Sequence, residues 1–74
     1  MTERDFIRLG ARLIRQLETV SALVAYNQRR LAGLLEVPRG KRHLVDLESI
    51  HSELEEAERL LAVTTQDLAD LEPS

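Results

Sequence analysis

The chain has no cysteine, and Phe6 and Tyr26 are its only aromatic residues. Without thiols it forms neither disulfides nor thiolate metal sites, which is consistent with a reducing cytoplasm. Two prolines and three glycines leave few places where regular structure can break. Because charged residues interrupt every apolar run, we predict neither a signal peptide nor a transmembrane segment, no membrane partner and a cytoplasmic location.

The chain also lacks the groups of residues that catalysis requires. It has no Ser/His/Asp constellation and no glycine-rich phosphate loop, so we predict no enzyme activity, no catalytic residues and no cofactor. Glu48 and His51 have the Glu-x-x-His spacing of di-iron bundles, but the first half of the chain supplies no inward-facing glutamates to complete such a site. We therefore predict no metal site, and a solvated pair between His51 and Glu55.

What the sequence does contain is a heptad pattern on each side of one break, Val37-Pro38-Arg39-Gly40. Proline restricts the residue before it, and Gly40 permits a reversal of the chain. The first half alternates two rows of residues, Phe6, Leu13, Val20, Asn27 and Leu34 with Gly10, Leu17, Val24 and Leu31. The second half alternates Leu47, Leu54, Leu61 and Leu68 with Ile50, Ala57, Thr64 and Leu71. This a/d pattern predicts helices that pack along their length through both rows.

Two helices around one break predict an all-α antiparallel hairpin in a single domain, residues 1–74. Thr2 and Asp5 have the spacing of a capping box, which favours a helix start at this point. The expected elements are a first helix over about 3–36, a turn at 37–41 and a second helix over about 42–71.

Two residues depart from the apolar pattern of the first helix. Asn27 falls on the stripe, where a buried amide specifies register because a wrong register leaves it unpaired. The alternative is that Asn27 is partly exposed at a wide point of the bundle. Gly10 also falls on the stripe, and we interpret it as a point of close packing between helices.

The net charge of −3 conceals an asymmetry along the chain. Residues 1–36 carry six arginines and four acids, a net charge of +2, and the connector 37–42 adds +3. Residues 43–74 carry one arginine and nine acids, a net charge of −8. The two predicted helices should therefore attract each other, or the acidic helix could offer its excess charge to a basic partner.

Apolar residues extend beyond the predicted stripe. The first helix is apolar on nearly every side at 20–26, and the second is similar at 60–63. A helix that is apolar all round is expected to be buried, and one facing helix cannot cover it. We predict a second interface that completes a four-helix bundle, either by homodimerisation or with helices of a protein partner. The predicted contact residues are Ala22, Leu23, Ala25, Tyr26, Leu60 and Val63.

Two segments of the chain resemble a known family. They are Arg30-Leu31-Ala32-Gly33, near the end of the first predicted helix, and Leu54-Glu55-Glu56-Ala57-Glu58-Arg59-Leu60-Leu61 in the second. With the short polar turn between them, they resemble the small E-type co-chaperones of type III secretion systems, over about residues 13–68. The resemblance implies a helical hairpin that helps to hold the needle subunit soluble in the cytoplasm.

The sequence thus favours a small interaction module, an adaptor or chaperone that holds an amphipathic helix of a partner. One alternative is a homodimeric docking module or a phage-type inhibitor of a host protein. A second is a nucleic-acid-associated factor that uses the basic turn of Arg39, Lys41 and Arg42. Nucleic acid is the less favoured partner, because no aromatic residue lies beside this turn and the acidic second helix would repel phosphates.

Overall fold

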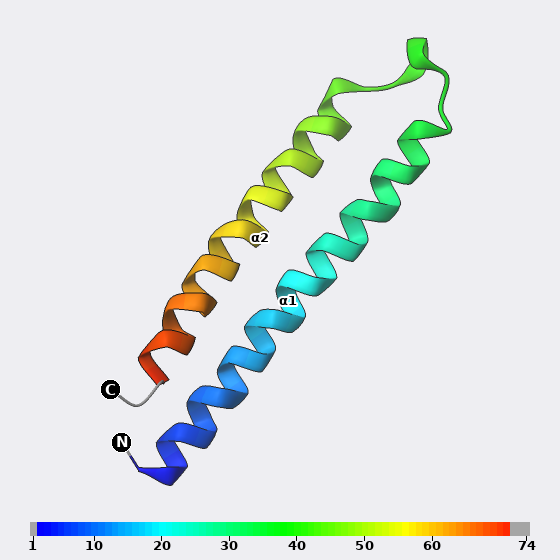
Figure 1. Ribbon diagram of the computed structural model, residues 1–74. Coiled ribbons are helices and arrows are strands. Elements are labelled where there is room, and N and C mark those ends of the chain that lie inside the picture. The colour runs from blue at the N-terminus through cyan, green and yellow to red at the C-terminus, as the bar shows by residue number, and fades with distance from the viewer. Residues whose placement is uncertain (1, 72–74) are drawn as a thin grey trace.

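A computed structural model of the protein describes residues 2–71. It contains helix α1 (Glu3–Leu35), a short 3-10 turn η1 (Arg39–Lys41) and helix α2 (Leu44–Leu71), and no strand occurs within this range. The two long helices run antiparallel, side by side, so that their free ends lie at the same end of the molecule (Figure 1). The predicted all-α two-helix hairpin is confirmed.

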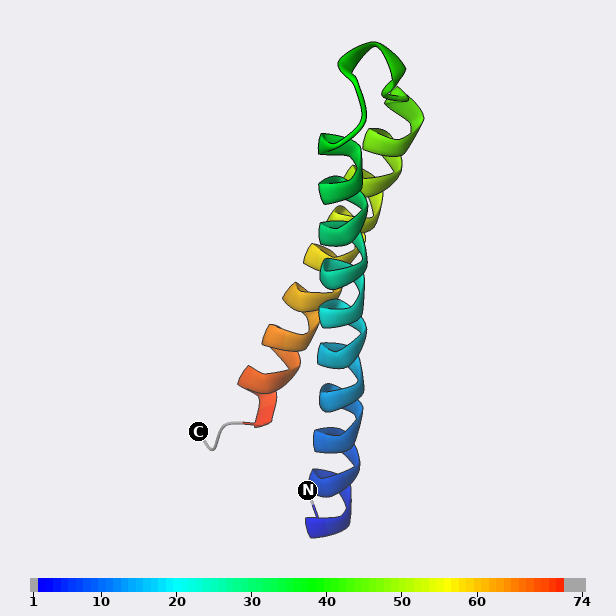
Figure 2. The ribbon, with the colours of Figure 1, turned by 90° about the vertical axis from the view of Figure 1, so that its right-hand side faces the viewer.

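The hairpin is long and thin. Its extents are 58 × 15 × 14 Å, and its radius of gyration is 17.2 Å, against about 11 Å for a compact chain of this length. Figure 2 shows that the helices cross at an angle, so that their lower ends diverge in that view. A rod one helix pair wide leaves most side chains in contact with solvent.

The start of α1 follows the predicted capping box. The Thr2 hydroxyl accepts from the Asp5 amide at 3.1 Å, and the Asp5 carboxylate accepts from the Thr2 amide at 3.4 Å. The carboxylates of Glu3 and Asp5 also suit the positive end of the helix dipole. The second helix begins at Leu44 rather than near residue 42, because Arg42 has an extended backbone (φ −76°, ψ 136°).

Arg42 ties the connection to the end of α1. Its Nε donates to the carbonyl oxygens of Leu34 and Val37, both at 3.1 Å. The last turn of α1 contains no basic residue of its own, so this guanidinium supplies the positive charge that the dipole favours there. Gly40 lies in η1 without a positive φ. The reversal therefore does not use the backbone freedom that the sequence analysis attributed to this glycine.

Each helix contributes a central row of side chains to the seam between the two helices. The fully buried residues of the described chain all lie on these rows, and they are Leu13, Asn27, Ile50, Ala57 and Thr64. Beside each central row lies a seam-edge row of half-buried residues. The seam-edge rows are Leu9, Gln16, Leu23 and Arg30 in α1, continued by Val37 just beyond its end, and Asp46, Glu53, Leu60 and Asp67 in α2.

The prediction that the other leucine-containing rows also fill the seam is wrong. Leu17 and Leu31 are 41% and 42% exposed, and Leu61 is 44% exposed. Rows three or four residues apart are separated by about 40–60° around a helix, and a single facing helix covers only two of the three adjacent rows. Gly10 is not a close-packing point within the hairpin either, because a Cβ added there meets no atom of α2 within 4 Å.

Neither helix, over the residues that the structure describes, has a segment long and apolar enough to cross a lipid bilayer.

The role of Arg42 can be tested against its neighbour Lys41. We expect Arg42→Gln to lower the free energy of unfolding by about 1 kcal/mol, because two carbonyl groups lose a charged donor at the helix end. Lys41→Gln removes the same charge from an exposed side chain and should change stability much less. Thermal unfolding at a fixed protein concentration measures both. Equal destabilisation by the two substitutions would contradict the capping role.

Candidate protein-interaction face

Two rows of apolar side chains lie on one side of the seam and form what we call the leucine face. Each residue of these rows follows a central-row residue by four positions, which turns it by about 40° around its helix. Because the two helices are antiparallel, this turn brings both rows to the same side of the hairpin. A shared groove confirms that the rows meet, since it is lined by Val20, Val24, Leu54, Ala57, Glu58 and Leu61. The leucine face comprises Leu17, Val24 and Leu31 of α1 and Leu47, Leu54, Leu61 and Leu68 of α2.

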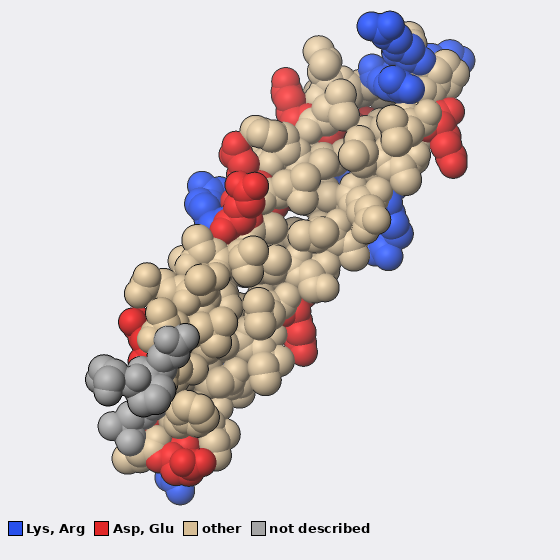
Figure 3. Space-filling model, in the orientation of Figure 1, with Lys and Arg blue, Asp and Glu red and all other residues tan. Residues whose placement is uncertain are grey.

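Exposed apolar side chains are concentrated on this side of the molecule. Of the exposed large hydrophobic residues in the range 2–71, those elsewhere are Phe6, at the start of the central row of α1, together with Tyr26, Val45 and Val63. Beyond the leucine face lies an outer row on each helix, Ile7, Ile14, Ser21, Gln28 and Leu35 in α1 and Leu44, His51, Glu58 and Thr65 in α2. These rows continue the apolar surface at Ile14, which is 59% exposed, and at Leu44, which is 73% exposed. Figure 3 shows a broad uncharged band along the hairpin, with the charged residues mostly at its edges and at the turn.

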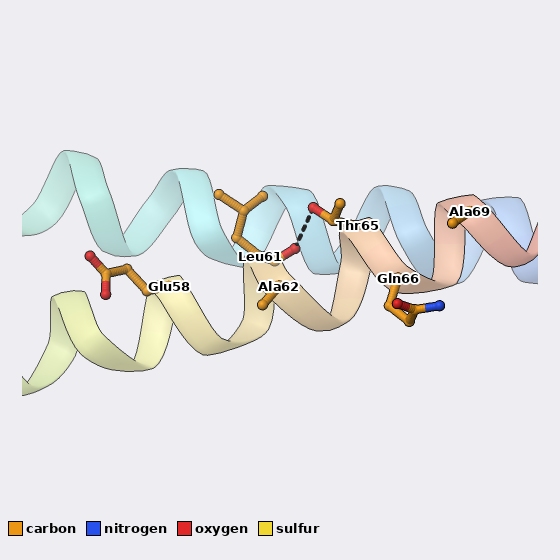
Figure 4. A pocket seen from close by; sticks show the side chains of 6 residues that line it. All are labelled: Glu58, Leu61, Ala62, Thr65, Gln66 and Ala69. Carbon is orange, nitrogen blue, oxygen red and sulfur yellow. Dashed lines mark hydrogen bonds between the residues drawn. The ribbon is translucent and has the colours of Figure 1, made fainter.

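The surface of α2 has a hollow where the leucine face borders the side of that helix that faces away from α1. This shallow hollow is drawn in Figure 4, and all of its lining residues come from α2. The Thr65 hydroxyl does not project as a free donor, because it donates to the carbonyl of Leu61 at 2.8 Å. The small side chains of Ala62 and Ala69 line this hollow together with Leu61. Another helix could therefore approach α2 closely at this level.

The seam, in contrast, is rich in polar contacts, and the first of these centres on Asn27. Its side chain is 1% exposed, so the alternative that it is partly exposed is wrong. Its Nδ2 donates to the carbonyl of Leu23 at 2.8 Å, and its Oδ1 accepts from Arg30 at 3.1 Å. Arg30 also donates to Glu53 at 2.9 Å, which links α1 to α2. The buried amide is thereby satisfied.

A second polar contact crosses the seam at Thr64, which is fully buried. Its hydroxyl lies 2.8 Å from both the side-chain oxygen of Gln16 and the carbonyl oxygen of Leu60. A hydroxyl donates one proton only, so we expect the Gln16 amide to turn its NH2 toward Thr64, which then donates to Leu60. Further along α2, Asp67 buries a carboxylate oxygen that has no hydrogen-bond partner among the described residues. Such groups make the seam a weak apolar core.

The six contact residues predicted from the sequence do not form one surface. Leu23, Leu60 and Val63 line a common hollow on the side opposite the leucine face, together with Thr19, Glu56 and Arg59. The outlying members of the predicted set are Ala22, which is exposed, Ala25, which is half-buried, and Tyr26, whose ring lies 5.4 Å from the Arg30 guanidinium carbon. The hollow is bordered by an exposed ion pair between Arg59 and Glu56 at 3.6 Å. This side is therefore the more polar of the two.

The three basic residues of the turn differ in what they contact. Arg42 holds the end of α1, whereas Arg39 and Lys41 are exposed. Charge attraction between the helices is represented by one ion pair among residues 2–71, between Arg30 and Glu53. The predicted solvated pair of His51 and Glu55 is confirmed, at 3.4 Å.

Over the same residues, His, Asp and Glu side chains nowhere gather in a group of three that could hold a metal ion. No protein-family model, curated protein or solved structure matches this chain. Support for the leucine face as a candidate interaction surface therefore comes from its own residues. Its sequence signal was the leucine recurring every seven residues from Leu47 to Leu68. The heptad pattern predicts that these leucines lie in the seam, but periodicity alone does not show which side of an apolar stripe meets which neighbour.

The polar contact at Thr64 provides a test of the seam. We expect Thr64→Val to lower the free energy of unfolding by about 1–2 kcal/mol, because the Gln16 amide is left without its partner, while adding Gln16→Leu should restore most of the loss. Thr65→Val is the matched control, since its hydroxyl makes a similar bond on an exposed surface. It should change stability by less than about 0.5 kcal/mol. Additive losses in the double variant, measured by thermal unfolding, would contradict the contact.

Proposed function

We propose that this protein is a small cytoplasmic interaction module, an adaptor or chaperone that binds amphipathic helices of proteins through its leucine face. The observation that carries the proposal is the distribution of apolar and polar side chains. Leu47 is 41% exposed and Leu68 is 44% exposed, while the seam buries Asn27 and Thr64. A hairpin that leaves its most apolar rows outside and its polar side chains inside is suited to receive further helices.

The surface area of the chain supports an additional interface of ordinary size. Its accessible surface is 6096 Å², whereas a compact monomer of 8.4 kDa exposes about 4,600 Å². The excess of about 1,500 Å² exceeds the roughly 800 Å² that one partner buries in a standard protein–protein interface. A pair of bound helices on the leucine face would remove surface of this order.

The shape of the face matches the way in which grooves hold helices. A bound amphipathic helix presents apolar residues at spacings of three and four, which fit between the ridges of a receiving surface. The groove between Val24 on α1 and Leu54 and Leu61 on α2 supplies such a surface. Its lining includes one carboxylate, that of Glu58.

The resemblance to the E-type co-chaperones suggests one partner, the needle subunit of a type III secretion system. Of the segment that carries this resemblance, Leu54 and Leu61 line the groove of the leucine face, while Leu60 lies in the seam. We propose a helix of a type III needle subunit as a specific occupant of this groove. The proposal rests on the resemblance together with the position of these two leucines.

Photo-crosslinking at two positions of α2 tests the proposed function. Leu61 and, separately, Val63 are replaced by benzoylphenylalanine. The two sites are comparably exposed, at 44% and 50%, but lie on different sides of the hairpin. In cells that also produce a type III needle subunit, we expect covalent adducts from position 61, attached to an amphipathic helical segment, and few from position 63. Mass spectrometry of the adducts identifies the segment.

Either of two results would count against this proposal. Adducts mainly from position 63 would favour the hollow of Leu23, Leu60 and Val63 as the binding site. Equal yields at both positions, spread over unrelated protein surfaces, would mean that neither side is a specific interface. Adducts from position 61 to a helix other than that of the needle subunit would retain the interaction module and reject this particular partner.

A further inference from the structure

We infer that the leucine face pairs with the leucine face of a second copy, with a two-fold axis along the hairpin, so that α1 of each copy lies against α2 of the other. The inference rests on the proposed function, because it treats the second copy as one of the helical partners that this face binds. It goes further by naming the occupant and the symmetry of the complex. Three features of the described residues lead to it.

The first feature is the arrangement of the rows around each helix. In a four-helix bundle each helix has two neighbours, so its side chains must form one contact row toward each neighbour and a central row toward the bundle axis. Both helices of this hairpin have that arrangement. The seam-edge row meets the neighbour already present, the central row is buried, and the leucine face remains for a second neighbour. A second hairpin supplies that neighbour to α1 and α2 at once.

The second feature is the match between the outer rows, which border the leucine face. A two-fold axis along the hairpin leaves height unchanged, so residues at equal height on α1 and α2 meet across the interface. The contact of Gln16 with Thr64 fixes which heights are equal. Paired by this register, the outer rows bring together Ile14 with Thr65, Ser21 with Glu58, Gln28 with His51, and Leu35 with Leu44. Two of these four pairs join polar side chains, and one sets Ile14 against Thr65. In the fourth, the two leucines, 68% and 73% exposed in the single hairpin, cover each other.

The third feature is charge. The inferred arrangement lays the basic α1 region, residues 1–36 with a net charge of +2, on the acidic region 43–74 with a net charge of −8. A two-fold axis across the hairpin would instead set α2 against α2 and bring the two copies of Glu58, near the middle of that helix, toward each other. Like charges facing each other destabilise an interface. The inferred axis does place both basic turns at one end, but these side chains are exposed and screened by salt.

The mass of the protein in solution tests whether a second copy binds. We expect about 17 kDa by light scattering, twice the 8.4 kDa of the chain, and a melting temperature that rises with concentration. Leu61→Lys should shift the mass to that of the single chain, while Val63→Lys on the other side should leave the dimer intact. A wild-type protein that stays a folded monomer at every concentration would overturn this inference. The proposed function would survive that result if position 61 still formed adducts with another protein's helix.

The absence of cysteine allows the symmetry to be tested with single-cysteine variants. Ser21→Cys and Glu58→Cys are prepared separately and then mixed, and oxidation traps residues that meet across the interface. We expect the mixed disulfide between the two variants in large excess over either self-linked dimer, and the same result for the matched pair Gln28→Cys and His51→Cys. Self-linked dimers of Glu58→Cys as the main product would overturn the inferred axis. Each substitution is at an exposed position, so the test does not depend on altering the core.

Discussion

A hairpin gives each of its helices only one neighbour, and this constraint governs the whole structure. The apolar arc of α1 and of α2 is three rows wide, whereas a single facing helix covers two rows. The seam therefore buries the central rows, half-buries the seam-edge rows and leaves Leu17, Leu47 and Leu61 more than two-fifths exposed. That uncovered third row and the thin, elongated shape of the helix pair together account for the excess surface area of the molecule.

Polar groups in the seam define how the two helices meet, but they add little apolar burial. The bond of Arg30 with Glu53 and the contact of Gln16 with Thr64 are each made only when the helices are correctly aligned. Among the described residues, only Leu13, Ile50 and Ala57 are fully buried apolar side chains. Alignment thus comes largely from the seam, while the proposed covering of the leucine face would add the apolar burial that chains of this size often need.

Periodicity, the break at Pro38 and the capping box of Thr2 and Asp5 were sufficient to predict the two helices, because these are local signals. The side of each helix that packs against the other helix was not predictable in the same way. Rows containing Leu54 and Leu60 lie on one continuous arc, and which of them faces α1 depends on how many helices surround the hairpin. The roles of Arg42 and of the partner of Asn27 were missed for a related reason. Arg42 reaches the end of α1 only after the chain has reversed, and Arg30, which bonds Asn27 within α1, meets Glu53 only when the two helices pack.

The central claim is that the leucine face, and not the opposite side, is covered when the protein is in its working assembly. NMR spectra of methyl groups in the presence of a soluble paramagnetic probe measure this directly, because the probe broadens the signals of methyl groups that it can approach. In the isolated hairpin the exposed fractions of Leu61 and Val63 differ little, at 44% and 50%. In the assembled protein, the account predicts that the methyl signals of Leu61 are protected while those of Val63 are broadened. Equal broadening of the two, or protection of Val63 alone, would contradict it.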